Sequence, residues 1–234
     1  HQGVLAVTGL AWYSWIPARQ PRVKNTAASR CRCIFMRIVM DQTTSSDIEA
    51  LLLTSAAVKK DTAAHCSEAA FSAAELIAHS LQNGGKLMLC GNGGSAGDAQ
   101  HLAAEFVATL DHQRPRSGLP ALALTTDTSF ITAYSNDFGF EGIFARQVET
   151  MGRPGDVLIC ISTSGNSKNV LSAAQAAAKA DIAVIGMTGR DGGKLAQHST
   201  ICLAVPSNVT MHIQESHIAL GHAMTLAVER LLGH

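Results

Sequence analysis

Two side chains with the type and spacing needed for chemistry lie near the middle of the chain. His101 and Glu105 are four positions apart in a stretch with helical character. Because an α-helix turns by about 100° per residue, both side chains lie on one face, one turn apart. An imidazole beside a carboxylate can bind a divalent metal ion or supply a general base. Polar pairs on solvated helix faces have the same spacing, so the pair alone leaves both interpretations open.

A second group of polar side chains falls in the last helical stretch of the chain. Gln214 and His222 are eight residues apart there, which is about 80° around a helix. His217 lies at a different angle from His222, so one histidine can face a site while the other packs or is solvated. A single histidine on a helix is more often structural than catalytic, and its position alone does not decide between the two.

The loop Gly91–Ala96, with the sequence GNGGSA, is suited to an anion. Its three glycines allow close approach of the backbone, and the helix that follows offers free N–H groups. Gly91, Gly93 and Ala96 also fit the dinucleotide pattern G-x-G-x-x-A, with Asp111 20 residues further on. In that pattern the acidic residue ends the second strand, whereas Asp111 precedes the second strand expected here. A tight strand-to-helix turn without a ligand is the third interpretation.

The loop Ser162–Ser167, with the sequence STSGNS, gathers four hydroxyl groups and an amide directly before a helical stretch. Hydroxyl and backbone N–H groups at a helix N-terminus suit a phosphate. The loop lacks the Gly-Lys-Ser/Thr ending of a nucleotide P-loop. An ordinary serine-rich loop with a helix cap is the alternative, although capping alone does not need four hydroxyls. Two such loops at one sheet edge favour one phosphorylated small ligand.

Short apolar runs alternate with helical stretches through most of the chain, which predicts an α/β fold with a mostly parallel sheet. Each run is continuous rather than alternating, as in strands buried on both faces. The predicted strands are 86–90, 121–125, 157–161, 182–187 and 201–205, and the helical stretches among them are 96–110, 144–151, 168–180 and 211–232. Ligands bind beyond the carboxyl ends of such strands, so Asp127, Asn136 and Asp137, in the loop expected after the second strand, are further candidates.

The segment from Ser45 to about Gln82 also has a helical pattern, with Ser46 or Asp47 as a suitable cap. Within it, a second helix is predicted over Ala64–Leu81, where apolar residues form one stripe. The Asn-Gly-Gly sequence at 83–85 is expected to end that helix.

Length and composition exclude several classes of protein. The chain has 234 residues, 47% of them hydrophobic, which is enough to bury a sizeable core. No apolar run approaches the ~18 residues of a membrane span, and a formal net charge of zero gives no support for non-specific nucleic-acid binding. Cys90, Cys160 and Cys202 lie in apolar runs, and no paired spacing indicates a zinc finger or a disulfide framework. A reducing compartment, hence the cytoplasm, is expected.

The zero net charge hides two unlike segments. Residues 1–40 contain six basic residues and no acidic one, so the remaining 194 residues carry 12 basic and 18 acidic side chains. This basic tail has some transit-peptide character and no clear periodicity. We expect it to be foreign to the fold, with the true start at Met36 or Met40, and we expect residues 41–234 to form a single domain.

These motifs, taken together and in this order, resemble the SIS (sugar isomerase) domain family, and more narrowly the phosphoheptose isomerases. The resemblance covers about residues 47–232 and rests on CGNGGSAGDAQHLAAEF (90–106), TTDTSFITAYSNDFGFEGIFARQVE (125–149), GDVLICISTSGNSKNV (155–170), TGRDGGKLA (188–196) and IQESHIALGH (213–222). It implies a three-layer αβα sandwich around a five-stranded parallel sheet, with N-terminal helices for oligomerisation. It also implies a homotetramer with sites built from neighbouring subunits.

The resemblance further implies residue roles. It assigns acid–base catalysis to Glu105 and His222, and one Zn²⁺ per subunit to His101, Glu105, Gln214 and His222. The substrate-binding residues that it implies are Asn92, Gly93, Gly94, Glu105, Asn136, Asp137, Ser162, Thr163, Ser164, Ser167 and Gln214. Glutamine is an unusual zinc ligand, so chemistry alone supports Gln214 least.

The implied reaction converts D-sedoheptulose 7-phosphate to D-glycero-D-manno-heptose 7-phosphate, the first step towards ADP-heptose and the heptose of the lipopolysaccharide core. Moving a proton between adjacent carbons through an enediol needs a base and an acid, and Glu105 and His222 are of fitting type. The alternative is a non-catalytic SIS protein that binds the replication initiator DnaA. The presence of both Glu105 and His222 favours the enzyme.

Overall fold

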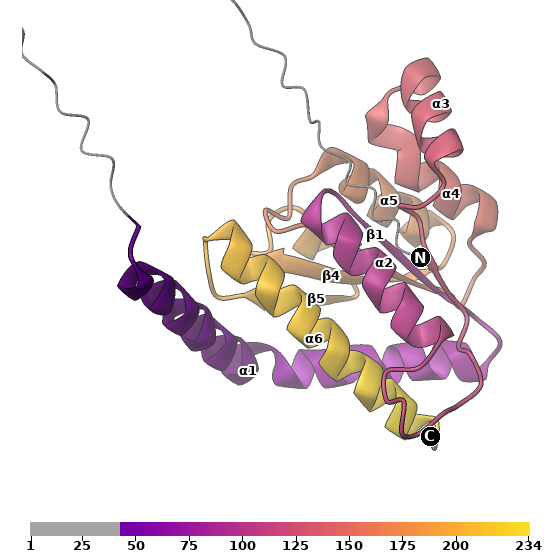
Figure 1. Cartoon of the computed structure of the whole chain (residues 1–234). Helices are drawn as coiled ribbons and strands as arrows, with labels where there is room; N and C mark the ends of the chain where they lie inside the picture. Colours follow the sequence, from indigo (N-terminus) through magenta and orange to yellow (C-terminus); the bar gives the residue numbers. More distant parts are fainter. Residues whose placement is uncertain (1–42) are drawn as a thin grey trace, which may run out of the picture. The chain divides into compact units, whose positions relative to one another are not determined.

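The computed structural model describes residues 43–234, a unit in which helices alternate with strands along the chain (Figure 1). The basic tail 1–40 and the two expected start positions, Met36 and Met40, lie outside the described residues. Among the described residues, no helix combines the length and the apolar character needed to cross a membrane.

A five-stranded, entirely parallel sheet forms the centre of this unit, as the alternating pattern predicts. Its strand order is β2-β1-β3-β4-β5. The strands are β1 (Leu87–Gly91), β2 (Ala121–Ala123), β3 (Val157–Ile161), β4 (Ala183–Gly189) and β5 (Ile201–Val205). Every residue of β1 and β3 is buried, whereas β2 and β5, at the sheet edges, are partly accessible. Central strands between two helical layers need apolar residues on both faces, which explains their unbroken apolar runs.

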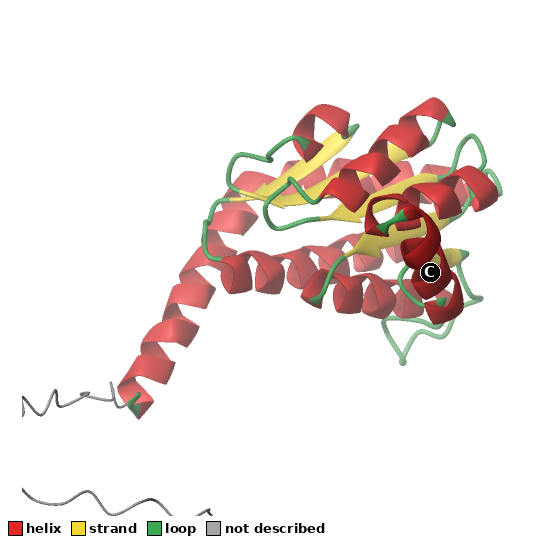
Figure 2. Cartoon of the chain, turned by 90° about the horizontal axis from the view of Figure 1, so that it is seen from above, coloured by secondary structure: helices red, strands yellow, loops and turns green. Residues whose placement is uncertain are grey.

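Helices cover both faces of the sheet, so the three-layer αβα architecture is confirmed (Figures 1 and 2). One core cluster joins the sheet to α1 (Ser45–Gln82), α2 (Gly94–Val107) and α6 (Thr210–Leu231), and the other joins it to α4 (Ile143–Met151) and α5 (Lys168–Lys179). Neighbouring strand residues alternate between the clusters, since Leu87 and Leu89 belong to the first and Met88 and Cys90 to the second. The remaining helical segments are α3 (Thr128–Phe138), η1 (Phe140–Gly142) and η2 (Leu195–His198).

The N-terminal region is one helix of 38 residues, so the prediction of a separate helix over Ala64–Leu81 was wrong. No glycine or proline interrupts the segment, and its buried stripe continues without a break from Ser55 to Ser80. The predicted cap, Ser46 or Asp47, was also two or three residues too late. Thr44 is the N-cap and forms a capping box with Asp47. The carboxylate of Asp47 accepts hydrogen bonds from the backbone N–H and the hydroxyl of Thr44, and these bonds lower the pKa of Asp47.

The segment after β2 was predicted as a loop, but most of it is helix α3. Asp127 caps this helix by accepting a hydrogen bond from the backbone N–H of Phe130, while Asn136 and Asp137 lie within its last turn. No residue of α3 is buried. The rings of Phe130, Tyr134 and Phe138 nevertheless stack at i, i+4 spacing along it, a helical pattern that the sequence prediction overlooked. The helix packs against η1 and α4, and Figure 1 shows it projecting from the rest of the unit.

The cysteines of the described region behave as small apolar residues. Cys66, Cys90 and Cys160 are buried within the two cores, and Cys202 is half-buried. Burial raises the pKa of the Cys66 thiol. The thiol of Cys160 also has a raised pKa, first because of its hydrogen bond with Cys90 and then because of burial. Both shifts keep these thiols protonated and unreactive.

Candidate active site

The two predicted anion loops meet at the switch point of the sheet. β1 lies between β2 and β3, and the chain crosses from β1 to β2 over one face and from β2 to β3 over the other. Gly91 and Ile161 are register partners at the ends of their strands, so the loops that begin at Asn92 and Ser162 start side by side. A crevice at the carboxyl ends of two such strands is the usual ligand site of an open parallel sheet.

Glycines shape the first loop and the helix start that follows it. Gly93, the N-cap of α2, has a φ of 56°, a conformation that favours glycine. At Gly94 a Cβ would lie 3.2 Å from the Cδ atom of Gln214. The absence of a side chain at Gly94 therefore allows Gln214, from the other end of the sequence, to lie against the first turn of α2.

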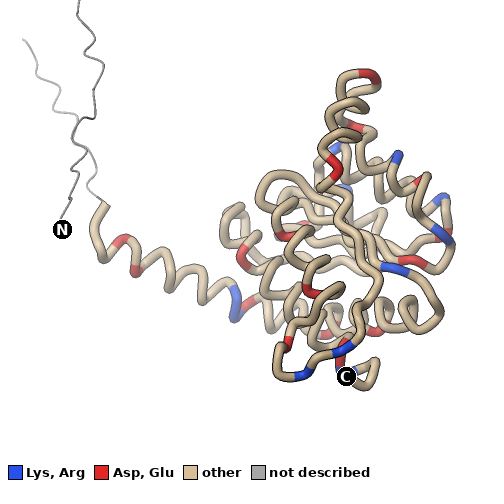
Figure 3. The backbone as a smooth tube through the Cα atoms, turned by 45° about the vertical axis from the view of Figure 1, so that its right-hand side comes forward, with Lys and Arg blue, Asp and Glu red and all other residues tan. Residues whose placement is uncertain are grey.

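The second loop is held by its own hydroxyl groups. The Oγ atoms of Ser162 and Ser167 are 3.1 Å apart, and the Oγ of Ser164 accepts a hydrogen bond from the backbone N–H of Asn166. Ser167 is the N-cap residue of α5, but its side chain makes no capping hydrogen bond. Neither loop contains Lys or Arg, and Figure 3 shows the basic residues spread over the unit. Hydroxyl and N–H groups are therefore the main anion ligands that these loops offer.

A cluster of titratable side chains lies between α2 and α6. The Nε2 atoms of His101 and His222 are 2.8 Å apart, and an Oε atom of Glu105 is 3.5 Å from Nε2 of His101. Glu105 is the more sheltered of the α2 pair, with 21% of its side chain exposed against 49% for His101. Three of the four predicted zinc ligands thus point at one place, and the sequence could not show which histidine of α6 would join them.

The donor set fits a divalent metal ion. His101, Glu105 and His222 each offer a ligand atom, and these atoms lie within 4.8 Å of one another; within residues 43–234 no other group of three or more His, Cys, Asp or Glu side chains does so. Two imidazoles and a carboxylate are a common zinc ligand set. Nitrogen atoms 2.8 Å apart also need a shared proton or cation between them.

Gln214, the fourth predicted ligand, is held by a residue that the sequence reasoning missed. Its Nε2 donates to Oδ1 of Asp98, which is buried on α2 one turn before His101. The other oxygen of Asp98 is buried without a hydrogen-bond partner. Burial raises the pKa of this carboxyl, and the hydrogen bond from Gln214 and the charges of His101 and His222 only partly offset it. The i, i+3 spacing of Asp98 and His101 was the sequence signal that could have found it.

The packing of α2 against α6 fixes the distance between the histidines. A Cβ at Gly221 would collide with Leu102, so glycine there permits close contact of the helices. Further along, buried Arg116 forms an ion pair with Glu229 of α6 at 2.8 Å and donates to the backbone carbonyls of Glu105 and Phe106. This clamp joins the end of α2, including the backbone of Glu105, to α6.

His217 belongs to the core and not to the cluster. It is fully buried, and its Nε2 donates to the backbone carbonyl of Thr188 at 3.0 Å. Burial lowers its pKa to about 4. The sequence left open which histidine of the last helix faces a site, and the structure answers with His222.

Asn136 and Asp137 are the predicted substrate-binding residues that stand apart from the cluster. Both are exposed on α3, and the side-chain amide of Asn136 donates to the carboxylate of Asp137. Their helix packs against η1 and α4 rather than α2 or α6. The structure places Ser162, Thr163, Ser164 and Ser167 at the switch point. Within one chain it does not place Asn136 and Asp137 beside the histidines.

A family model, curated relatives and solved structures all place this chain in the same protein family. Residues 49–189 match the model of the SIS domain. A phosphoheptose isomerase of a Roseiflexus species is 56% identical over 159 residues, which cover 68% of this chain and 80% of the relative. That of Rhodospirillum rubrum is 53% identical over 167 residues, covering 71% and 88% of the two chains. The structure of the phosphoheptose isomerase from Neisseria gonorrhoeae matches 80% of this chain and 100% of its own, with 46% identity and a TM-score of 0.75. The chain therefore belongs to the SIS domain family, and within it to the phosphoheptose isomerases.

Proposed function

We propose that this protein is an aldose–ketose isomerase that converts D-sedoheptulose 7-phosphate to D-glycero-D-manno-heptose 7-phosphate. The observation that carries the proposal is the convergence of His101, Glu105 and His222 beside two loops suited to a phosphate. Membership of the phosphoheptose isomerases identifies the sugar phosphate. No observation favours the alternative of a DnaA-binding protein without activity.

The chemistry needs a base and an acid on one side of the open-chain sugar. Glu105, which is partly sheltered from water, removes a proton from C1 of the ketose and delivers it to C2. His222 donates a proton to the C2 oxygen and accepts one from the C1 hydroxyl, which completes the enediol exchange. His101 lies against both side chains and holds them in place. The hydroxyl loop and the free N–H groups of α5 hold the phosphate at the other end of the substrate.

We infer that His101, Glu105, Gln214 and His222 hold one Zn²⁺ per subunit. When bound, such an ion polarises the carbonyl oxygen and stabilises the negative charge of the enediolate. The three clustered side chains support this inference. For Gln214, support comes from its hydrogen bond to Asp98: the amide nitrogen is occupied as a donor, which leaves the carbonyl oxygen as the atom available to a cation.

We also infer that the protein works as a homotetramer whose sites combine residues of neighbouring subunits. Asn136 and Asp137 are exposed on α3, away from the cluster of their own chain, so another subunit is their natural place of action. The first part of α1 supports assembly as well, because Ile48, Leu52 and Leu53 are each more than half exposed. We expect a second copy to cover them.

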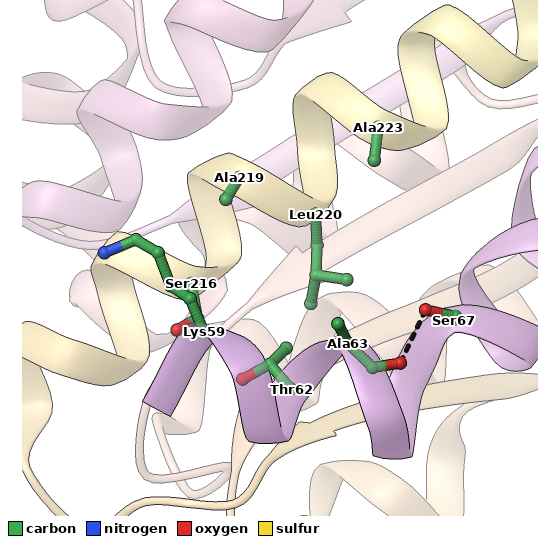
Figure 4. Close-up of a pocket in the computed structure, with 8 residues that line it drawn as sticks. All are labelled: Lys59, Thr62, Ala63, Ser67, Ser216, Ala219, Leu220 and Ala223. Atoms are coloured by element: carbon green, nitrogen blue, oxygen red, sulfur yellow. Dashed lines mark hydrogen bonds between the residues drawn. The ribbon is translucent and has the colours of Figure 1, made fainter. Parts of the chain in front are cut away.

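A groove between α1 and α6 gives further support for assembly. It has a volume of about 180 Å³ and is lined mainly by small and apolar side chains, among them Ala63, Ala219, Leu220 and Ala223 (Figure 4). Small residues along two adjacent helices let a third helix approach closely. We expect α1 or α6 of a neighbouring subunit to occupy this groove.

The proposed reaction is the first step towards ADP-heptose and the heptose of the lipopolysaccharide core, and we place it in the cytoplasm. The reduced, buried cysteines agree with a reducing compartment. We treat residues 41–234 as the single SIS domain that performs the reaction.

The proposal is tested by incubating the purified protein with sedoheptulose 7-phosphate and measuring aldoheptose phosphate. Replacement of Glu105 by Gln keeps the shape of the side chain but removes the base, so we expect kcat to fall by about 10²–10⁴-fold. Glu149→Gln, on the exposed face of α4, is the matched control and should leave kcat unchanged. Wild-type protein that forms no aldoheptose phosphate would refute the proposed function.

A further inference from the structure

Two asparagine side chains connect the anion loops across the switch point. The Nδ2 of Asn92, in the first loop, donates to Oδ1 of Asn169, and the Nδ2 of Asn169 donates back to Oδ1 of Asn92, both at 2.8 Å. Asn169 is 3% exposed and Asn92 is half-buried. A reciprocal amide pair of this kind fixes the distance between its two backbones, because both bonds break if either loop moves.

The start of α5 determines which way the pair is oriented. Asn169 is the second residue of that helix, and its Oδ1 also accepts the backbone N–H of Val170 at 3.0 Å. A backbone N–H can only donate, so the atom of Asn169 facing it must be the oxygen. The nitrogen of Asn169 then faces Asn92, which in turn must present its oxygen to that nitrogen and its own nitrogen to Oδ1. A free donor at a helix N-terminus thus sets the orientation of the Asn92 amide.

The locked amide of Asn92 retains one N–H group for a ligand. Of the two hydrogens on Nδ2, one is used by Asn169, and the other has no hydrogen-bond partner among the described residues. Asn92, Ser167 and Asn169 line the same cavity, of about 650 Å³, whose other lining residues are Phe138, Gly139, Phe140, Glu141 and Lys168. A rotated amide would present its oxygen there instead, which would repel the oxygens of a phosphate.

We propose that Asn169 is a positioning residue for sugar-phosphate binding: it locks the amide of Asn92 so that an N–H group faces the phosphate and holds the two loops together before the ligand arrives. The proposal rests on the proposed function and assigns Asn169 no contact with the reacting carbons. It therefore predicts an effect on binding and not on proton transfer.

The test is a double-mutant cycle of Asn92→Ala and Asn169→Ala, measured as KM and kcat with sedoheptulose 7-phosphate. We expect Asn169→Ala to raise KM about five- to tenfold, the loss of one to two hydrogen bonds, with kcat within about twofold of wild type. Because Asn169 acts through Asn92, adding Asn169→Ala to Asn92→Ala should change KM by less than about twofold. Asn169→Asp should also raise KM, since its second oxygen faces Oδ1 of Asn92.

A second buried side-chain amide, that of Gln147, serves as the control for a purely structural effect of Asn169→Ala. Gln147 is also buried and donates to two backbone carbonyls, so Gln147→Ala should lower the melting temperature similarly without raising KM. An unchanged KM in Asn169→Ala, or fully multiplicative effects of the two asparagine substitutions, would overturn the proposal.

Titration of sedoheptulose 7-phosphate into the Glu105→Gln variant, with and without Asn169→Ala, gives the binding effect apart from turnover. If the wild-type protein shows no turnover but Asn169→Ala still weakens binding of sedoheptulose 7-phosphate, the proposed function is refuted and the positioning role of Asn169 stands.

Discussion

Burial of His217 should make the fold sensitive to acid. Its imidazole is completely enclosed, Nε2 donates its hydrogen to the carbonyl of Thr188, and Nδ1 is buried without a partner. A second proton would have to sit on Nδ1, where nothing accepts a hydrogen bond, and this burial lowers the pKa to about 4. The unfolded chain binds the same proton with a pKa of about 6.5.

The free-energy cost follows from these two pKa values. Between pH 6.5 and pH 4 the unfolded state binds more protons than the folded state, so the free energy of unfolding falls as the pH falls. For a folded pKa of about 4, this residue alone removes about 2 kcal/mol of stability between pH 7 and pH 5, and about 3 kcal/mol by pH 4. Above about pH 8 it contributes almost no pH dependence, because the histidine is then neutral in both states.

The assay is urea unfolding at fixed protein concentration and several pH values, with wild type and His217→Gln compared. Glutamine retains a donor for the carbonyl of Thr188 but does not titrate, so the variant should lose about 2 kcal/mol less than wild type between pH 7 and pH 5. Carboxylates such as Glu215, whose hydrogen bond from Ser55 lowers its pKa, contribute equally to both proteins and cancel in the difference. His112→Gln, at an exposed loop position, should retain the wild-type slope. Equal slopes of unfolding free energy against pH for wild type and His217→Gln would show that burial of His217 does not cause the acid sensitivity.

Three further predictions concern the site and its support. Arg116→Ala leaves the buried carboxylate of Glu229 unpaired, so urea unfolding should show a loss of about 3–5 kcal/mol. Gly165→Ala places a Cβ against the carbonyl of Gly192 at a residue with a φ of 62°, which should displace the phosphate loop. Steady-state kinetics should therefore show a KM raised at least about tenfold. An unchanged KM would mean that this loop does not hold the phosphate. Treatment with a chelator should lower kcat by at least about 100-fold, and zinc should restore it, whereas full activity of metal-free protein would contradict the zinc inference.

The sheet and its layers could be predicted from the sequence because burial leaves a direct signature. A strand such as β3 is covered on both faces, so its residues form an unbroken apolar run. The same reasoning fails for α3, which buries no residue, and for the length of α1, whose regular pattern contains no signal that separates one helix from two.

The candidate site was predictable in part, for a similar reason. The i, i+4 pair of His101 and Glu105 depends only on helix geometry, whereas the choice of His222 over His217 depends on how α6 packs against α2. Asn169 is missed because its role arises from contact with a residue 77 positions away in the sequence, and no local pattern records such a contact.

Glu105 is proposed to move a proton between C1 and C2 of sedoheptulose 7-phosphate, and this transfer can be followed directly. The most direct measurement is ¹H NMR of the reaction in D₂O, which follows both conversion and the isotope at C2 of the product. We expect an aldoheptose 7-phosphate carrying deuterium at C2, because the carboxyl of Glu105 exchanges its proton with solvent. Glu105→Gln should show neither conversion nor deuterium incorporation. Absence of aldoheptose phosphate with wild-type protein, or normal turnover by Glu105→Gln, would contradict the proposed role of Glu105.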